Sequence, residues 1–129
     1  MTEPVVVRAF RIHQTGGPEQ LTLDQIELPP PGPGQARVRH TAVGVNYIDT
    51  YHRGGLYPLP MPATLGSEAA GVIEALGEGV TELLVGQRVG YAVAGPGAYA
   101  DARVPVSYTH LRGACGGRRR WRPPWCGDR

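Results

Sequence analysis

Between residues 5 and 106, apolar and polar positions alternate in short runs, and glycine or proline separates one run from the next. Alternation with a period of two is typical of strands that are buried on one face. The pattern predicts six strands, over residues 5–13, 21–28, 36–45, 69–76, 87–94 and 98–106. The first two strands form a predicted hairpin, in which a change of phase between Leu23 and Ile26 indicates a β-bulge.

One helix is predicted, and it starts after Asn46. The side-chain oxygen of Asn46 can accept a hydrogen bond from the first turn, and Asp49 stands three residues on, as in a capping box. Gly54 and Gly55 then end the helix. Short strands with one or two short helices predict a mainly β fold, a partly open antiparallel barrel. The sequence lacks the repeated strand–helix units of a doubly wound sheet, so we expect no Rossmann domain.

The charge of the chain changes sign near residue 106. Residues 1–106 carry seven arginines against ten acidic residues, whereas residues 107–129 carry six arginines against Asp128. Both cysteines and both tryptophans also fall in this last segment, which lacks apolar periodicity. We therefore expect one domain over residues 1–106 and a disordered, non-native tail over residues 107–129. The tail is rich in residues with GC-rich codons, so we interpret it as a frameshift or assembly artefact and the chain as truncated.

Hydropathy and charge also bear on partners and location. No run approaches the roughly 20 apolar residues of a membrane span, and the first eleven residues lack the features of a signal peptide. The sequence therefore predicts a cytoplasmic chain without a membrane partner. The arginine-rich run 118–122 leaves nucleic-acid binding open as an alternative for the tail, but we expect no specific nucleic-acid partner.

Four segments carry a family resemblance. Residues 44–51 read GVNYIDTY, residues 55–58 GLYP, residues 66–73 GSEAAGVI and residues 85–89 VGQRV. Together they resemble the zinc-free quinone oxidoreductases related to zeta-crystallin, in the medium-chain dehydrogenase/reductase superfamily. The likeness runs from about Arg8 to about Pro105 and implies the N-terminal, GroES-like domain of such an enzyme. In that family a Rossmann domain carries NADPH, a hydride passes from it to a quinone, and we expect the full-length enzyme to be a homodimer.

The resemblance implies a site built around the predicted helix. It implies catalytic roles for Asn46, Tyr51 and Tyr57, and a cofactor-facing run of Asn46, Tyr47, Ile48, Asp49, Thr50 and Tyr51. The residues themselves leave a structural alternative open, in which Asn46 and Asp49 only cap the helix and the tyrosines cover the barrel. Because most of the NADPH site belongs to a Rossmann domain, we expect this chain to be inactive alone.

The resemblance also implies that no metal takes part. It aligns Asn46 with a ligand cysteine of zinc alcohol dehydrogenases and Ser67 with their ligand histidine, and neither an amide nor a neutral hydroxyl is a normal zinc ligand. Residues 90–102 contain no cysteine for a structural zinc site. We expect Glu68 to bind backbone amides. Without a Lewis acid, the acceptor must take hydride readily, which suits a quinone or another small electrophilic acceptor.

A second class of function stays open at this stage. A co-chaperonin-like subunit shares the barrel fold, but it would assemble as a ring and has no use for the run from Asn46 to Tyr57. For the domain of a reductase, we expect an exposed apolar patch near Tyr51, Tyr57 and the last strand, where a second domain would lie.

Overall fold

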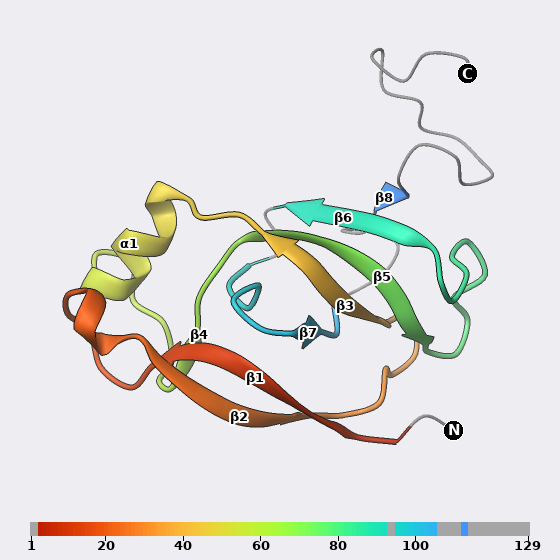
Figure 1. Cartoon of the computed structure of the whole chain (residues 1–129), viewed down its shortest axis with the longest axis horizontal. Helices are drawn as coiled ribbons and strands as arrows, with labels where there is room; N and C mark the ends of the chain where they lie inside the picture. Colours follow the sequence, from red (N-terminus) through yellow and green to blue (C-terminus); the bar gives the residue numbers. More distant parts are fainter. Residues whose placement is uncertain (1–2, 93–94, 106–111, 114–129) are drawn as a thin grey trace, which may run out of the picture.

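The computed structural model describes residues 3–92, 95–105 and 112–113. In chain order they form β1 (Val5–Ile12), the 3-10 helix η1 (Pro18–Gln20), β2 (Thr22–Leu28), β3 (Ala36–Val43), α1 (Tyr47–Gly54), β4 (Ala63–Thr64), β5 (Glu68–Leu76), β6 (Arg88–Ala92), β7 (Ala102–Arg103) and β8 (Arg112–Gly113). Figure 1 shows the long strands in two layers, with α1 and η1 together at one end. The predicted helix is therefore present, with the predicted start and end.

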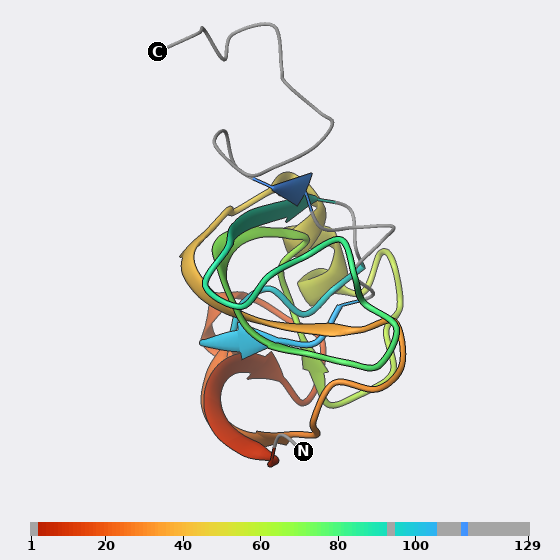
Figure 2. The same ribbon diagram turned by 90° about the vertical axis from the view of Figure 1, so that its right-hand side faces the viewer.

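Two antiparallel sheets make the barrel. One has the strand order β2-β1-β4 and the other the order β7-β3-β5-β6-β8. Figures 1 and 2 place the β1–β2 hairpin across from the larger sheet, with the segment that leads to β7 between them. An isolated bridge between Ala9 and Ala100 links this segment to β1. The predicted mainly β, partly open antiparallel barrel is confirmed, and the described residues contain no parallel, doubly wound sheet.

Two details of the predicted strands are wrong. The register between β1 and β2 runs without a break, so no bulge separates Leu23 from Ile26. Leu23 instead points outward and is 56% exposed, which means that the change of phase reflects an apolar residue on the surface. Within the described part of the predicted strand 98–106, which ends at residue 105, the only named strand is β7. The amides of residues 97–99 bind the carbonyl groups of residues 65 and 66, so they are not free for a continuous ladder.

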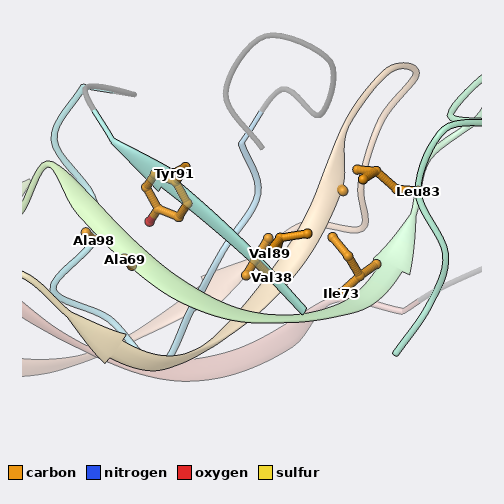
Figure 3. Close-up of a cluster of buried hydrophobic side chains, with 8 residues drawn as sticks. Val38, Ala69, Ile73, Leu83, Val89, Tyr91 and Ala98 are labelled. Carbon is orange, nitrogen blue, oxygen red and sulfur yellow. The ribbon is translucent and has the colours of Figure 1, made fainter. Parts of the chain in front are cut away.

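The larger sheet carries the main core. In a strand every second side chain points to the same face, so alternate residues of β3, β5 and β6 turn inward and lose contact with water. The buried side chains of this cluster are Ala36, Val38, Ala69, Ile73, Leu83, Val89, Tyr91 and Ala98 (Figure 3). A second, smaller cluster contains Ile12, Ala63 and Leu65, and Tyr99 packs against it.

β3 and β5 approach each other closely at Gly71. A Cβ atom at this position would overlap the carbonyl oxygen of Arg39 on β3. The register between the two strands shifts next to this point, between His40 and Ala42. Glycine is therefore required at position 71, because any side chain would push the two backbones apart.

His40 ties three parts of the barrel together. Its Nδ1 lies 2.7 Å from the carbonyl oxygen of Ala100, and its Nε2 lies 2.9 Å from the hydroxyl of Tyr91 on β6. Because a carbonyl only accepts, Nδ1 carries the proton and Nε2 accepts from Tyr91. Burial lowers the pKa of His40, and the charge of Arg103 on β7 lowers it further, while Ala100 and Asp101 act in the opposite direction. The fold therefore holds this histidine neutral.

The described part of the tail is β8, which pairs with β6. The expected disorder of residues 107–129 and the arginine-rich run 118–122 otherwise lie outside the described residues, and the domain boundary at residue 106 stays a prediction. Within the described residues, the structure contains no helix of the length and apolar character that a membrane crossing requires.

Candidate active site

Helix α1 is fixed at both ends by its own sequence. Asn46 has extended backbone angles, and its N–H donates to Oδ2 of Asp49 at 2.9 Å. The amide of Asp49 donates in turn to the backbone carbonyl of Asn46 at 3.0 Å. At the other end Gly55 has a φ of 88°, in the left-handed region that suits glycine, and its N–H donates to the carbonyl of His52. The predicted role of Asp49 in the cap and the glycine stop are both confirmed, whereas the Asp49 amide binds the backbone carbonyl of Asn46 and not its side-chain oxygen.

Asp49 is the most deeply buried residue of the predicted cofactor run, with 3% of its surface exposed. Besides the Asn46 amide, its carboxylate accepts hydrogen bonds from the hydroxyl of Ser67 at 3.2 Å and from that of Tyr99 at 2.8 Å. The three donors come from the start of α1, the turn before β5 and the segment before β7. A buried carboxylate needs such donors, and here they join three separate parts of the chain.

Tyr99 is the residue of this network that the sequence reasoning missed. Its hydroxyl stays protonated, because burial and the neighbouring Asp49 carboxylate raise its pKa far above the ordinary value. No spacing rule connects positions 49 and 99, so no motif indicates the contact. The available signal was indirect, since a carboxylate that is buried beside a helix start needs more donors than the first turn supplies.

Three tyrosines gather on the outside of α1, and we call Tyr47, Tyr51 and Tyr57 the tyrosine face. Their exposed fractions are 82%, 40% and 51%. The rings of Tyr47 and Tyr51 are 6.2 Å apart, and those of Tyr51 and Tyr57 meet edge to face at 5.9 Å. The chain folds back after the helix, since the amides of Leu56 and Tyr57 both donate to the carbonyl of Tyr51. This turn is what brings the ring of Tyr57 to that of Tyr51.

The expected apolar patch is present in part. Tyr51, Leu56 and Tyr57 are exposed in α1 and in the turn that follows it. In the predicted last strand Ala98 and Ala102 are buried, but residues 99–101 line a hollow of about 510 Å³. The other residues of this hollow include the exposed side chains of Phe10, Leu23, Val43 and Val45. Exposed apolar side chains therefore lie at α1 and also around this hollow.

The other predicted residues of the run differ in how exposed their side chains are. Asn46 is half-buried at the helix start, and Ile48 is exposed at 41%. The hydroxyl of Thr50 donates a hydrogen bond to the backbone carbonyl of Tyr47 at 2.6 Å, so the hydroxyl already has a partner within the helix. The side chains with free surface are thus the tyrosines and Ile48, while Asp49 and Thr50 already have partners.

The described residues contain no group of three histidine, cysteine, aspartate or glutamate side chains that could hold a metal ion. The hydroxyl of Ser67, which the resemblance aligned with a ligand histidine, donates a hydrogen bond to Asp49. Glu68 lies against Gly44, where a Cβ atom would overlap its carboxylate. Contrary to the expectation, no backbone amide of the described residues donates to the Glu68 carboxylate; the Gly44 amide donates instead to the backbone carbonyl of Glu68 at 3.1 Å.

A hollow of about 710 Å³ lies away from the tyrosine face, over β3, β5 and β6. Its lining includes Glu68 and Arg88 but is made mostly of small residues such as Ala70 and Gly90. None of the three tyrosines lines it. The tyrosine face is consequently an open surface, of the kind that forms one wall of a cleft when another element covers it.

The described residues thus form a partly open barrel with an exposed aromatic surface at α1. The chain belongs to the alcohol dehydrogenase GroES-like domain family, whose sequence profile matches residues 32–118. The GroES-like fold predicted from the sequence is thereby confirmed. The match ends beyond residue 106 and so includes part of the segment expected to be non-native.

Comparison with individual proteins points to one branch of the superfamily. The chain is 51% identical over 90 residues to a quinone oxidoreductase of Pseudomonas aeruginosa, covering 69% of this chain and 28% of the relative. It is 45% identical over 103 residues to a 2-haloacrylate reductase of a Burkholderia species, covering 77% and 31%. The structure of Escherichia coli quinone oxidoreductase complexed with NADPH superposes with a TM-score of 0.77 at 38% identity, covering 80% of this chain and 32% of that one.

These matches confirm the resemblance to quinone oxidoreductases that the sequence motifs indicated. The chain spans about a third of the length of the relatives it matches.

Proposed function

We propose that this chain is the substrate-side domain of a zinc-free, NADPH-dependent quinone reductase, and that the tyrosine face receives the quinone. The observation that carries the proposal is the exposed set of three rings on α1 and the turn after it, which nothing in the barrel core requires. Aromatic rings bind one another by stacking or by edge-to-face contact, worth about 0.5–1.5 kcal/mol per pair beyond burial. A flat, neutral quinone ring matches such a surface.

The residues present fit one end of the cofactor. Tyr47 and Tyr51 offer exposed aromatic surface for a nicotinamide ring, and Asn46 offers an amide beside it at the helix start. The sequence contains no glycine-rich phosphate loop of the GxGxxG type, so the remainder of the cofactor needs a second domain. NADPH, when bound, supplies the hydride that the reduction consumes. The part of this chain is to hold the acceptor ring in place and to keep water away from it.

The chemistry of the acceptor agrees with a site that lacks a metal. Reduction of a quinone makes its ring aromatic, so hydride uptake needs no Lewis acid at the oxygen. We expect the chain alone to turn over no quinone, because it provides one wall of the cleft, and we expect the complete enzyme to be a homodimer.

A carboxylate acceptor fits less well than a neutral ring. A 2-haloacrylate carries a negative charge, which would favour a cation on the surface that binds it. Arg53 is the sole arginine of α1, and it is half-buried with its Nε on the carbonyl oxygen of Gly16. The tyrosine face therefore favours a quinone over 2-chloroacrylate.

A chimera tests the proposal. Residues 1–105 are joined to the C-terminal two thirds of the Pseudomonas aeruginosa relative, and NADPH oxidation is followed with duroquinone. This quinone is fully substituted and so cannot add to cysteine thiols. We expect turnover by the chimera and none by the chain alone.

Variants of the chimera locate the activity. Tyr51→Ala is expected to lower kcat/KM at least tenfold, while Leu84→Ala, at a residue 69% exposed in the loop before β6, leaves it unchanged. A folded chimera that oxidises no NADPH with any quinone, or a Tyr51→Ala chimera as active as its parent, would refute the assignment.

A further inference from the structure

The Tyr99 hydroxyl shares an acceptor atom with the start of α1. It donates to Oδ2 of Asp49 at 2.8 Å, and the same oxygen accepts the N–H of Asn46 at 2.9 Å. The other carboxylate oxygen accepts from Ser67. Tyr99 thus reaches the helix start through one atom, although it lies fifty residues further along the chain.

The backbone holds Tyr99 in place independently of its hydroxyl. Its N–H donates to the carbonyl of Leu65 at 2.8 Å, and its own carbonyl accepts from Phe10 at 2.7 Å. The ring lies so close to Gly66 that a Cβ atom there would overlap it. Removing only the hydroxyl therefore leaves the residue's packing and backbone contacts as they are.

The hydroxyl matters because α1 has only eight residues. A helix of this length is not stable alone, so tertiary contacts must hold its first turn. With Tyr99, the charged and buried carboxylate of Asp49 is directed at the Asn46 amide. Without it, Oδ2 is left with one donor, and the carboxylate gains by turning towards water, which releases Asn46.

We propose that Tyr99 is a positioning residue for the tyrosine face: acting through Asp49, it fixes the first turn of α1 and so sets where Tyr47 and Tyr51 stand. The inference rests on the proposed function in that the tyrosine face is taken as the surface that receives the quinone. Tyr99 itself touches neither substrate nor cofactor in this account. Its effect on the site passes through one carboxylate oxygen.

The test compares Tyr99→Phe with Tyr91→Phe in the full chain. Tyr91→Phe is the matched control, because it also removes a single hydroxyl, the one that donates to His40 in the barrel core. Amide hydrogen exchange is measured by NMR at Asn46 and Asp49, and duroquinone binding is measured by titration. We expect exchange at Asn46 to be about tenfold faster in Tyr99→Phe and within twofold of the parent in Tyr91→Phe. Duroquinone binding weakens only in Tyr99→Phe.

A second replacement separates hydrogen bonding from packing. With 3-fluorotyrosine at position 99, the ring and hydroxyl remain but the hydroxyl becomes a stronger donor, so exchange at Asn46 should slow instead of accelerating. A role in packing alone would not give opposite responses to the two changes. If exchange at Asn46 is the same in all variants, the positioning role is refuted. If Tyr99→Phe loosens α1 but duroquinone leaves the signals of Tyr47 and Tyr51 unmoved in the parent chain, the positioning role stands and the proposed function fails.

Discussion

Replacing Asp49 by asparagine and by alanine should give two very different losses of stability. The asparagine side chain has nearly the shape of aspartate. Its oxygen can take the place of Oδ2 and keep the donors Asn46 and Tyr99, while its NH2 group faces Ser67. A serine hydroxyl can turn and accept, so all three contacts survive without the charge.

The expected magnitudes follow from the number of donors. A hydrogen bond to a charged acceptor contributes about 1.5–3 kcal/mol and a neutral one about 0.5–1.5 kcal/mol. Three bonds that each weaken by about 1 kcal/mol cost about 3 kcal/mol, but the neutral side chain no longer carries the cost of a buried charge, so Asp49→Asn should lower the free energy of unfolding by roughly 1–2 kcal/mol. Asp49→Ala leaves three donors without their acceptor, and with some of them regaining water we expect a loss of about 3–5 kcal/mol. That is a large share of the roughly 5–15 kcal/mol that stabilises a typical domain.

Urea unfolding followed by circular dichroism measures both losses. With a slope near 2 kcal/mol per molar urea, the midpoint should fall by under 1 M for Asp49→Asn and by about 2 M for Asp49→Ala. Equal losses in the two variants would show that the negative charge of Asp49, and not its hydrogen bonds, holds the network together. A loss below about 1 kcal/mol for Asp49→Ala would show that the network contributes little to stability.

Three further predictions concern the barrel and the expected absence of a metal. The folded chain holds His40 neutral with a lowered pKa, so the unfolded chain binds more protons just below pH 6.5, and stability should fall there as the pH falls, by up to ~1.4 kcal/mol per pH unit. His40→Asn should make the urea midpoint depend less on pH between pH 7 and 5, and an unchanged dependence would contradict this. Gly71→Ala should lower the free energy of unfolding by about 3 kcal/mol or more, because its Cβ atom would overlap the Arg39 carbonyl. Gly90→Ala on β6 has room for a Cβ atom and should leave the melting temperature nearly unchanged, and similar melting temperatures for both variants would refute the steric argument. Treatment with 1,10-phenanthroline should change neither the melting temperature of the chain nor the activity of the chimera, and a loss of either would reveal a metal.

Local chemistry made much of the fold predictable. Asn46 and Asp49 carry the capping signal, and Gly54 with Gly55 carries the stop, so α1 was expected at its observed place. Strand alternation located the long strands because each buries one face. The alternation was misleading at Leu23, because the sequence does not distinguish an apolar side chain on the surface from one in the core.

The long-range part of the site was beyond sequence reasoning. The contacts of Asp49 with Ser67 and Tyr99 depend on how the barrel closes, and alternation does not encode which loops meet. The segment before β7 illustrates the same limit. Its residues have the alternation of a strand, yet the amides of residues 97–99 donate to the carbonyl groups of residues 65 and 66, and only an isolated bridge joins the segment to β1.

The shortness of α1 links recognition to heat tolerance. Two turns of helix and the turn that follows them carry the tyrosine face, and they have no stability apart from the barrel that anchors them. The surface that would meet a quinone therefore melts no later than the sheets behind it. Selection for a more heat-resistant enzyme would leave the three tyrosines alone and would act on the anchoring contacts beneath them.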